Sequence, residues 1–94
     1  MQVLLIEDDE VLGSALSSGL ELHGWKVNWV KDGAAGLKEM VSKQFNAVIL
    51  DLMLPKIGGM EVLEYVRSRS INVPVMILTT RDNPEDKIKG FNKG

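Results

Sequence analysis

Three short apolar runs, none of them interrupted by a polar residue, constrain the fold of this 94-residue chain most strongly. They occupy residues 3–6, 47–50 and 75–78. A strand that is covered on both faces has this pattern, because every side chain meets apolar neighbours instead of every second one. Residues 27–30 form a weaker run, interrupted by Asn28 and Trp29, which is typical of a strand at the edge of a sheet.

Between these runs, apolar residues recur at helical spacing and predict amphipathic helices. The predicted buried stripes are Val11, Leu12, Ala15, Leu16 and Leu20; Ala34, Leu37, Met40 and Val41; and Gly59, Val62, Leu63 and Val66. Gly24 is expected to end the first helix, and a fourth helix is expected to begin after Asn83-Pro84 and to run towards Phe91. Strict alternation of strand and helix predicts a doubly wound α/β fold with a parallel sheet and right-handed crossovers.

Composition excludes several classes of function. The chain has no cysteine and a single histidine, so disulfide frameworks, zinc ribbons, thiol nucleophiles and multi-histidine metal sites are ruled out. Eleven basic and 13 acidic residues leave a formal net charge of −2, so the chain lacks the excess positive charge that is typical of nucleic-acid binding. No apolar run is long enough to cross a membrane, and the start resembles neither a signal nor a transit peptide. We therefore expect a single cytoplasmic domain that uses carboxylate chemistry.

Polar residues follow three of the predicted strands. Glu7 and Asp8 come after the first run, Asp51 after the third strand of the chain and Thr79 after the fourth. In open parallel sheets the functional crevice lies beyond the carboxyl ends of the strands, so these side chains are expected to gather there. Crowded carboxylates repel one another unless a cation neutralises them, and oxygen ligands without His or Cys favour Mg²⁺ or Ca²⁺. A carboxylate nucleophile beside such a cation suits phosphoryl transfer.

A purely local explanation of the same residues stays open. Acids between a strand and a helix often cap the helix, and Asp9 and Glu10 are assigned to that role. Asp51 alone could be a loop residue and Thr79 a strand former. An aspartate-based phosphatase usually carries a second Asp two residues after its nucleophile, and Met53 stands there instead. No glycine-rich dinucleotide or P-loop motif occurs.

Taken together, Val3-Leu4-Leu5-Ile6-Glu7-Asp8-Asp9, Leu50-Asp51-Leu52-Met53-Leu54-Pro55 and Ile77-Leu78-Thr79 closely resemble the receiver domain of bacterial response regulators. The stretch from Leu50 to Pro55, and the Thr-Arg-Asp after the last run, look most like the OmpR/PhoB-type transcription regulators. The resemblance extends over the whole chain. It implies a flavodoxin-like receiver fold in which the four strands are ordered 2-1-3-4.

The resemblance also implies roles for individual residues. Asp51 matches the aspartate that accepts a phosphoryl group from a sensor histidine kinase. Asp8 matches a direct Mg²⁺ ligand, Glu7 its neighbour that acts partly through water, and Met53 the position whose backbone carbonyl completes the metal shell. Thr79 matches the switch hydroxyl. The chain is thus expected to be a regulatory phosphoacceptor and not an enzyme with a separate substrate.

Two departures from the family pattern shape the remaining expectations. Thr80 stands where Ala or Gly is usual, and the chain stops at Gly94, before the fifth strand, the lysine, the switch aromatic and the fifth helix of the family. We therefore expect residues 1–94 to be a truncated receiver with weak phosphotransfer. It would self-associate, as a homodimer or larger assembly, through the strand at 75–78 and the helix after it. Nucleic acid would be bound only by an effector domain outside this chain. The alternative is an interaction module that works without phosphorylation.

Overall fold

The computed structural model describes residues 1–54 and 57–78, and within them strands and helices alternate as predicted. The elements are β1 (Gln2–Ile6), α1 (Glu10–Leu22), β2 (Lys26–Val30), α2 (Gly33–Ser42), β3 (Ala47–Asp51), α3 (Gly59–Ser68) and β4 (Val75–Leu78). The four strands are all parallel and lie in the order β2-β1-β3-β4. The predicted doubly wound sheet and its strand order are confirmed.

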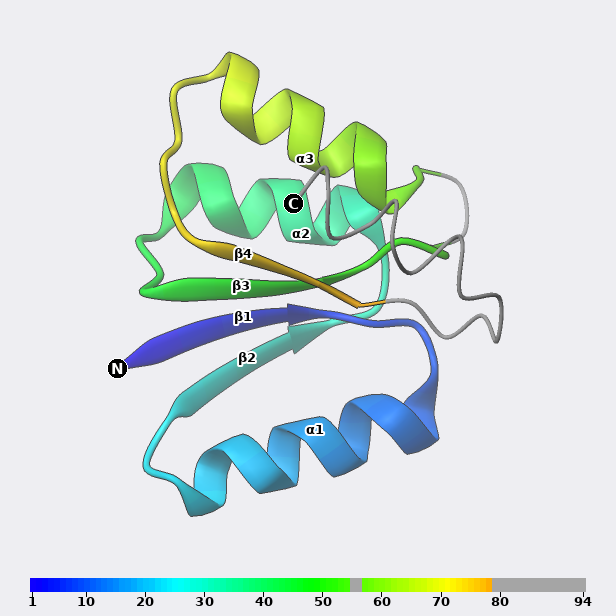
Figure 1. Ribbon diagram of the computed structural model, residues 1–94, viewed down its shortest axis with the longest axis vertical. Helices are drawn as coiled ribbons and strands as arrows, with labels where there is room; N and C mark the ends of the chain where they lie inside the picture. Colours follow the sequence, from blue (N-terminus) through cyan, green and yellow to red (C-terminus); the bar gives the residue numbers. More distant parts are fainter. Residues whose placement is uncertain (55–56, 79–94) are drawn as a thin grey trace.

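The sheet separates two helical layers (Figure 1). Helix α1 covers one face, while α2 and α3 lie together on the other. Leu4 and Ile6 of β1 pack into the cluster under α2 and α3, whereas Val3 and Leu5 pack on the α1 side with Leu16 and Leu20. Both faces of β1 are therefore buried, which is why its sequence shows no polar alternation.

Strand β4 is less buried than its apolar sequence predicts. Among its four residues only Ile77 is buried, and Met76 is 60 % exposed. In the described part of the chain β4 pairs with β3 alone, so it has a neighbour on one side.

The predicted buried faces of α1 and α2 are partly wrong, whereas that of α3 is correct. Val11 and Ala15 of α1, and Ala34 and Val41 of α2, are exposed. The buried positions at the helix–sheet contacts include glycines, namely Gly13 in α1 and Gly36 in α2, and Gly33 of α2 is buried against Ile57 and Val62. A Cβ at position 36 would lie 2.4 Å from Ile6 Cδ1, so the backbone of α2 itself rests on the sheet. Counting apolar side chains misses such contacts, because a glycine has no side chain to count.

The ends of α1 follow their sequence signals. Asp9 caps the N-terminus, and its side chain accepts hydrogen bonds from the backbone amides of Val11 and Leu12. The helix ends at His23, followed by Gly24 with a φ of +88°, a left-handed conformation that favours glycine. The predicted helix after Asn83-Pro84 lies outside the described residues. Among the described helices, none combines the length and apolarity needed to span a membrane.

Candidate metal and phosphoryl site

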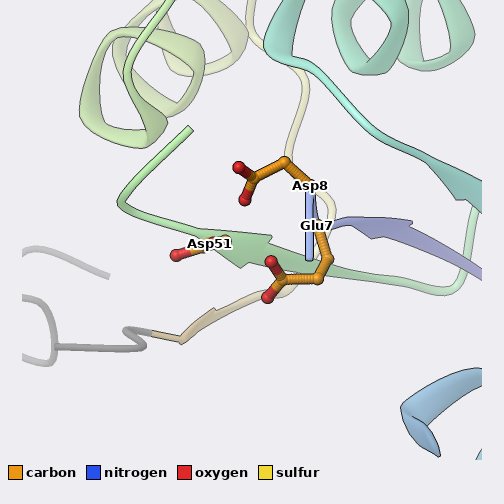
Figure 2. Close-up of side chains that lie close together, drawn as sticks. All are labelled: Glu7, Asp8 and Asp51. Carbon is orange, nitrogen blue, oxygen red and sulfur yellow. The ribbon is translucent and has the colours of Figure 1, made fainter. Parts of the chain in front are cut away.

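The carboxyl ends of β1 and β3 bring three acids together. Ile6 pairs with Leu50 in the parallel register, so Glu7 and Asp8 leave β1 where Asp51 ends β3. One carboxylate oxygen from each of Glu7, Asp8 and Asp51 lies within 4.8 Å of the other two. Figure 2 shows these side chains, which we call the acidic cluster, grouped at that edge of the sheet. The predicted grouping of Glu7, Asp8 and Asp51 is therefore found in the fold.

Two members of the acidic cluster are fully buried and only half satisfied. Glu7 Oε2 accepts a hydrogen bond from the amide of Asp9 at 2.9 Å, and Asp51 Oδ1 accepts one from the amide of Met53 at 2.9 Å. Glu7 Oε1 and Asp51 Oδ2 have no hydrogen-bond partner among the described residues. Each carboxylate is thus oriented by one backbone amide and keeps its second oxygen available.

The surroundings of Glu7 make its ionised form costly. Burial is the largest cause that raises the pKa of Glu7 from 4.5 to about 7; the neighbouring carboxyls of Asp51 and Asp8 act in the same direction, while the hydrogen bond from the Asp9 amide lowers this pKa. Buried acids that are not neutralised commonly behave in this way. Glu7 therefore holds a proton more readily than an ordinary glutamate does.

The residues present fit a hard divalent cation. Two orphaned, buried carboxylate oxygens would carry a large desolvation penalty, and a cation removes it by pairing with both. Asp8 is exposed and offers a third carboxylate, so the cluster combines buried and accessible oxygens. Oxygen-only ligands with room for water are typical of Mg²⁺ sites.

The remaining two acids of the 7–10 run serve the helix, as predicted. Asp9 is the N-cap of α1. Glu10 lies in the first turn and forms an ion pair with Lys31, whose hydrogen bond and charge lower the pKa of Glu10. The local explanation therefore holds for Asp9 and Glu10, while Glu7 and Asp8 belong to the acidic cluster.

Helix α3 approaches Asp51 through a glycine. A Cβ at position 59 would lie 2.4 Å from the backbone oxygen of Asp51 and 2.7 Å from Leu52 Cα. The amide of Gly59 donates to the carbonyl of Leu52 at 3.3 Å. This close approach holds the backbone that carries Asp51 against the start of α3.

The roles predicted for two site residues, Thr79 and Met53, are not tested by the described residues. Thr79 lies outside the described residues, and its assignment as switch hydroxyl stays a prediction. Met53 is placed next to Asp51 by its amide, but the assignment of its carbonyl to a metal ion also stays a prediction.

One contact of the site was missed from the sequence. The indole Nε1–H of Trp29 in β2 donates to the backbone carbonyl of Glu7 at 2.9 Å. In the sequence, Trp29 indicates only an interruption of an edge strand and no role at the site. The signal in the sequence is a tryptophan near the end of β2 together with a glycine, Gly13, inside α1. A glycine at that position leaves space for the large ring.

Comparisons with known proteins agree with this geometry. Residues 3–94 match the family described as "Response regulator receiver domain". The chain is 46 % identical to transcriptional regulatory protein QseB of Haemophilus influenzae and 38 % identical to response regulator protein PmrA of Pseudomonas aeruginosa. Both alignments cover the whole chain and 42 % of the relative, so the chain spans about two fifths of the length of these curated relatives.

Solved structures show the same architecture. The receiver domain of Francisella response regulator 1452 superposes with a TM-score of 0.88 at 29 % identity, covering 99 % of this chain and 77 % of that one. Vibrio cholerae chemotaxis protein CheY4 superposes with a TM-score of 0.84 at 29 % identity, covering 99 % and 79 %. On the family match and this shared fold, the chain belongs to the receiver domains of two-component response regulators.

Proposed function

We propose that this receiver accepts a phosphoryl group on Asp51 from a sensor histidine kinase, in a reaction that depends on Mg²⁺. The observation that carries the proposal is the acidic cluster, in which Glu7 and Asp51 are fully buried and each keeps one oxygen without a hydrogen-bond partner in the described part of the chain. Structural acids rarely remain in this state, because each unpaired buried oxygen lowers stability. Receiver domains of response regulators are regulatory phosphoacceptors that work with histidine kinases, which is the class of reaction proposed here.

In this proposal the Oδ2 atom of Asp51 is the nucleophile. It forms the new bond to phosphorus while the phosphorus–nitrogen bond of the phosphohistidine breaks, and the histidine nitrogen takes the electron pair. Asp51 Oδ1 stays on the Met53 amide, which fixes the direction from which Oδ2 approaches. A bound Mg²⁺ ion would neutralise the acids and stabilise charge on the phosphoryl oxygens. Glu7, Asp8 and Asp51 are the side chains proposed to hold it, with the Met53 carbonyl as a further ligand.

The first test is Mg²⁺ binding measured by titration calorimetry. We expect binding by the unmodified chain and its loss in Asp51→Asn and Asp8→Asn. Asp9→Asn is the matched control, because Asn still caps α1 and position 9 contributes no oxygen to the cluster. A chain that binds no Mg²⁺ would favour the alternative of an interaction module that works without phosphorylation.

The second test identifies the acceptor. Incubation with acetyl phosphate and Mg²⁺, followed by intact mass measurement, should add one phosphoryl group to the unmodified chain and none to Asp51→Asn. Labelling that persists in Asp51→Asn assigns the acceptor to another residue.

The output of the whole protein is proposed from its relatives. QseB carries the name of a transcriptional regulatory protein, so we propose that phosphorylation here switches a transcription regulator through an effector domain. Self-association through β4 also belongs to this proposal. It is supported by the exposed apolar side chain of Met76 on β4. Sedimentation that shows a stable monomer at high concentration would contradict it.

A further inference from the structure

We propose that Trp29 is a positioning residue for the acidic cluster, because its indole holds the peptide that links Glu7 to Asp8. This inference rests on the proposed function, since it assigns a residue that tunes the affinity of the same site for Mg²⁺. Trp29 lies on β2, carries no ligand atom and touches the site through one hydrogen bond.

The hydrogen bond from Trp29 restrains the peptide unit that joins Glu7 to Asp8. The carbonyl of Glu7 and the amide nitrogen of Asp8 belong to one planar peptide unit, so fixing the carbonyl fixes the direction in which the chain continues to Asp8. The amide of Glu7 donates to the carbonyl of Val30 at 3.0 Å, and its carbonyl accepts from Trp29 Nε1 at 2.9 Å. Both backbone groups of Glu7 are therefore held by β2, beyond the last residue of β1.

The side chain supplies a donor where the chain turns away from the sheet. Glu7 follows β1, and two residues later Asp9 caps α1. A carbonyl at such a turn is satisfied by water or by a side chain when no further strand residue pairs with it. The Trp29 indole performs this function from within the protein, so the peptide is held by a rigid ring.

The indole is seated between two elements. A Cβ on Gly13 would lie 2.1 Å from Trp29 Cζ2, so the ring rests directly on the backbone of α1. Lys31 Nζ lies 5.5 Å from the ring centroid, within the range of a cation–π contact, and pairs with Glu10 at the start of α1. These contacts of the ring limit how far Nε1 can move relative to the Glu7 carbonyl.

Trp25 provides the contrast within the same molecule. It is half-buried against the α1 side of the sheet, as Trp29 is, but no hydrogen bond of its indole is present among the described residues. If Trp29 served packing alone, removing its N–H while keeping an aromatic ring would affect the two positions alike. Partners that orient metal ligands affect metal affinity, typically by 10- to 100-fold.

The experiment compares Trp29→Phe with Trp25→Phe. In calorimetric titrations with MgCl₂, we expect Trp29→Phe to weaken binding by roughly 10-fold, at the low end of the range for residues that orient ligands. Trp25→Phe should bind with the affinity of the unmodified chain. Equal affinity in the unmodified chain and Trp29→Phe would overturn the inference and leave the proposed function intact. Absence of Mg²⁺ binding in the unmodified chain would overturn both.

A readout without metal separates positioning from general loss of stability. Amide hydrogen exchange of Asp8 and Asp9 in the metal-free chain should accelerate in Trp29→Phe relative to amides of β3. Uniform acceleration across the sheet would instead assign Trp29 a packing role. Gly13→Ala offers a second variant that keeps the indole but displaces it, and it should also weaken Mg²⁺ binding. Gly19→Ala, on the same helix with open space around it, should not.

Discussion

At the level of single residues, the two oxygens of each buried carboxylate in the acidic cluster differ in their hydrogen bonding. Glu7 and Asp51 each accept a hydrogen bond from one backbone amide, and the second, buried oxygen of each has no partner within residues 1–54 and 57–78. This arrangement costs stability in the absence of a cation, because desolvation is not offset at the free oxygen. The cost should appear as a dependence of stability on pH.

The prediction concerns Glu7, whose pKa is raised from 4.5 to about 7 by burial and by Asp51. Between these two values the folded chain binds more protons at Glu7 than the unfolded chain. The free energy of unfolding of the metal-free chain should therefore fall as the pH rises from about 4.5 to 7. Urea denaturation in the presence of a chelator measures this effect.

Comparison with Glu7→Gln isolates the contribution of this carboxyl from all other titrations. The difference in stability between the two proteins should change across this window, favouring Glu7→Gln increasingly at high pH. Glu10→Gln serves as the control, because Glu10 is exposed and paired with Lys31. A pH-independent difference between the unmodified chain and Glu7→Gln would contradict the prediction.

At the level of elements, the contact between α1 and the sheet depends on a glycine. Glycine inside a helix ordinarily destabilises it relative to alanine, by about 0.5–1 kcal/mol. Gly13 nevertheless occupies the buried face of α1, because the Trp29 ring takes the space of a side chain. The change in the free energy of unfolding caused by a Gly→Ala substitution should therefore have opposite signs at two positions of this helix.

We expect Gly13→Ala to lower the free energy of unfolding by about 1–3 kcal/mol, the usual cost of overpacking. Gly19→Ala should raise it by about 0.5–1 kcal/mol, because a Cβ there meets nothing within 4 Å. Chemical denaturation of both variants provides the measurement. In a Trp29→Ala background the cost of Gly13→Ala should disappear, and a cost that persists would show that the ring is not its cause.

At the level of the whole molecule, the site exists only when the sheet is assembled. Glu7 and Asp8 come from the end of β1 and Asp51 from the end of β3, and parallel pairing of these strands places them together. An unfolded chain does not present the cluster, so a cation that binds it stabilises the fold by mass action.

Mg²⁺ at a hundred times its dissociation constant should raise the free energy of unfolding by about 2.7 kcal/mol. At a fixed Mg²⁺ concentration the gain should be larger at pH 8 than at pH 5, because Glu7 with a pKa of about 7 is protonated at the lower pH and its proton competes with the ion. Thermal or urea unfolding with and without MgCl₂ tests this. Asp51→Asn should lose most of the gain, and an equal gain in this variant would place the ion elsewhere.

Much of this architecture follows from local pattern. The unbroken runs in β1 and β3 predict buried central strands, the interrupted run in β2 predicts an edge strand, and the stripe from Gly59 to Val66 predicts the buried face of α3. Strand order then places Glu7, Asp8 and Asp51 at one edge. These predictions succeed because periodicity and chain order are properties of neighbouring residues.

The sequence by itself thus determined the fold class, the family and the three acids of the cluster, since alternation and short motifs encode them locally. Only the tertiary structure decided the buried faces of α1 and α2, the exposure of β4, the pKa of Glu7 and the contact of Trp29 with Glu7. Each of these depends on which atoms from distant segments approach one another. The role of Gly13 depends on the indole that packs against it, and the pKa of Glu7 depends on the groups around its carboxylate.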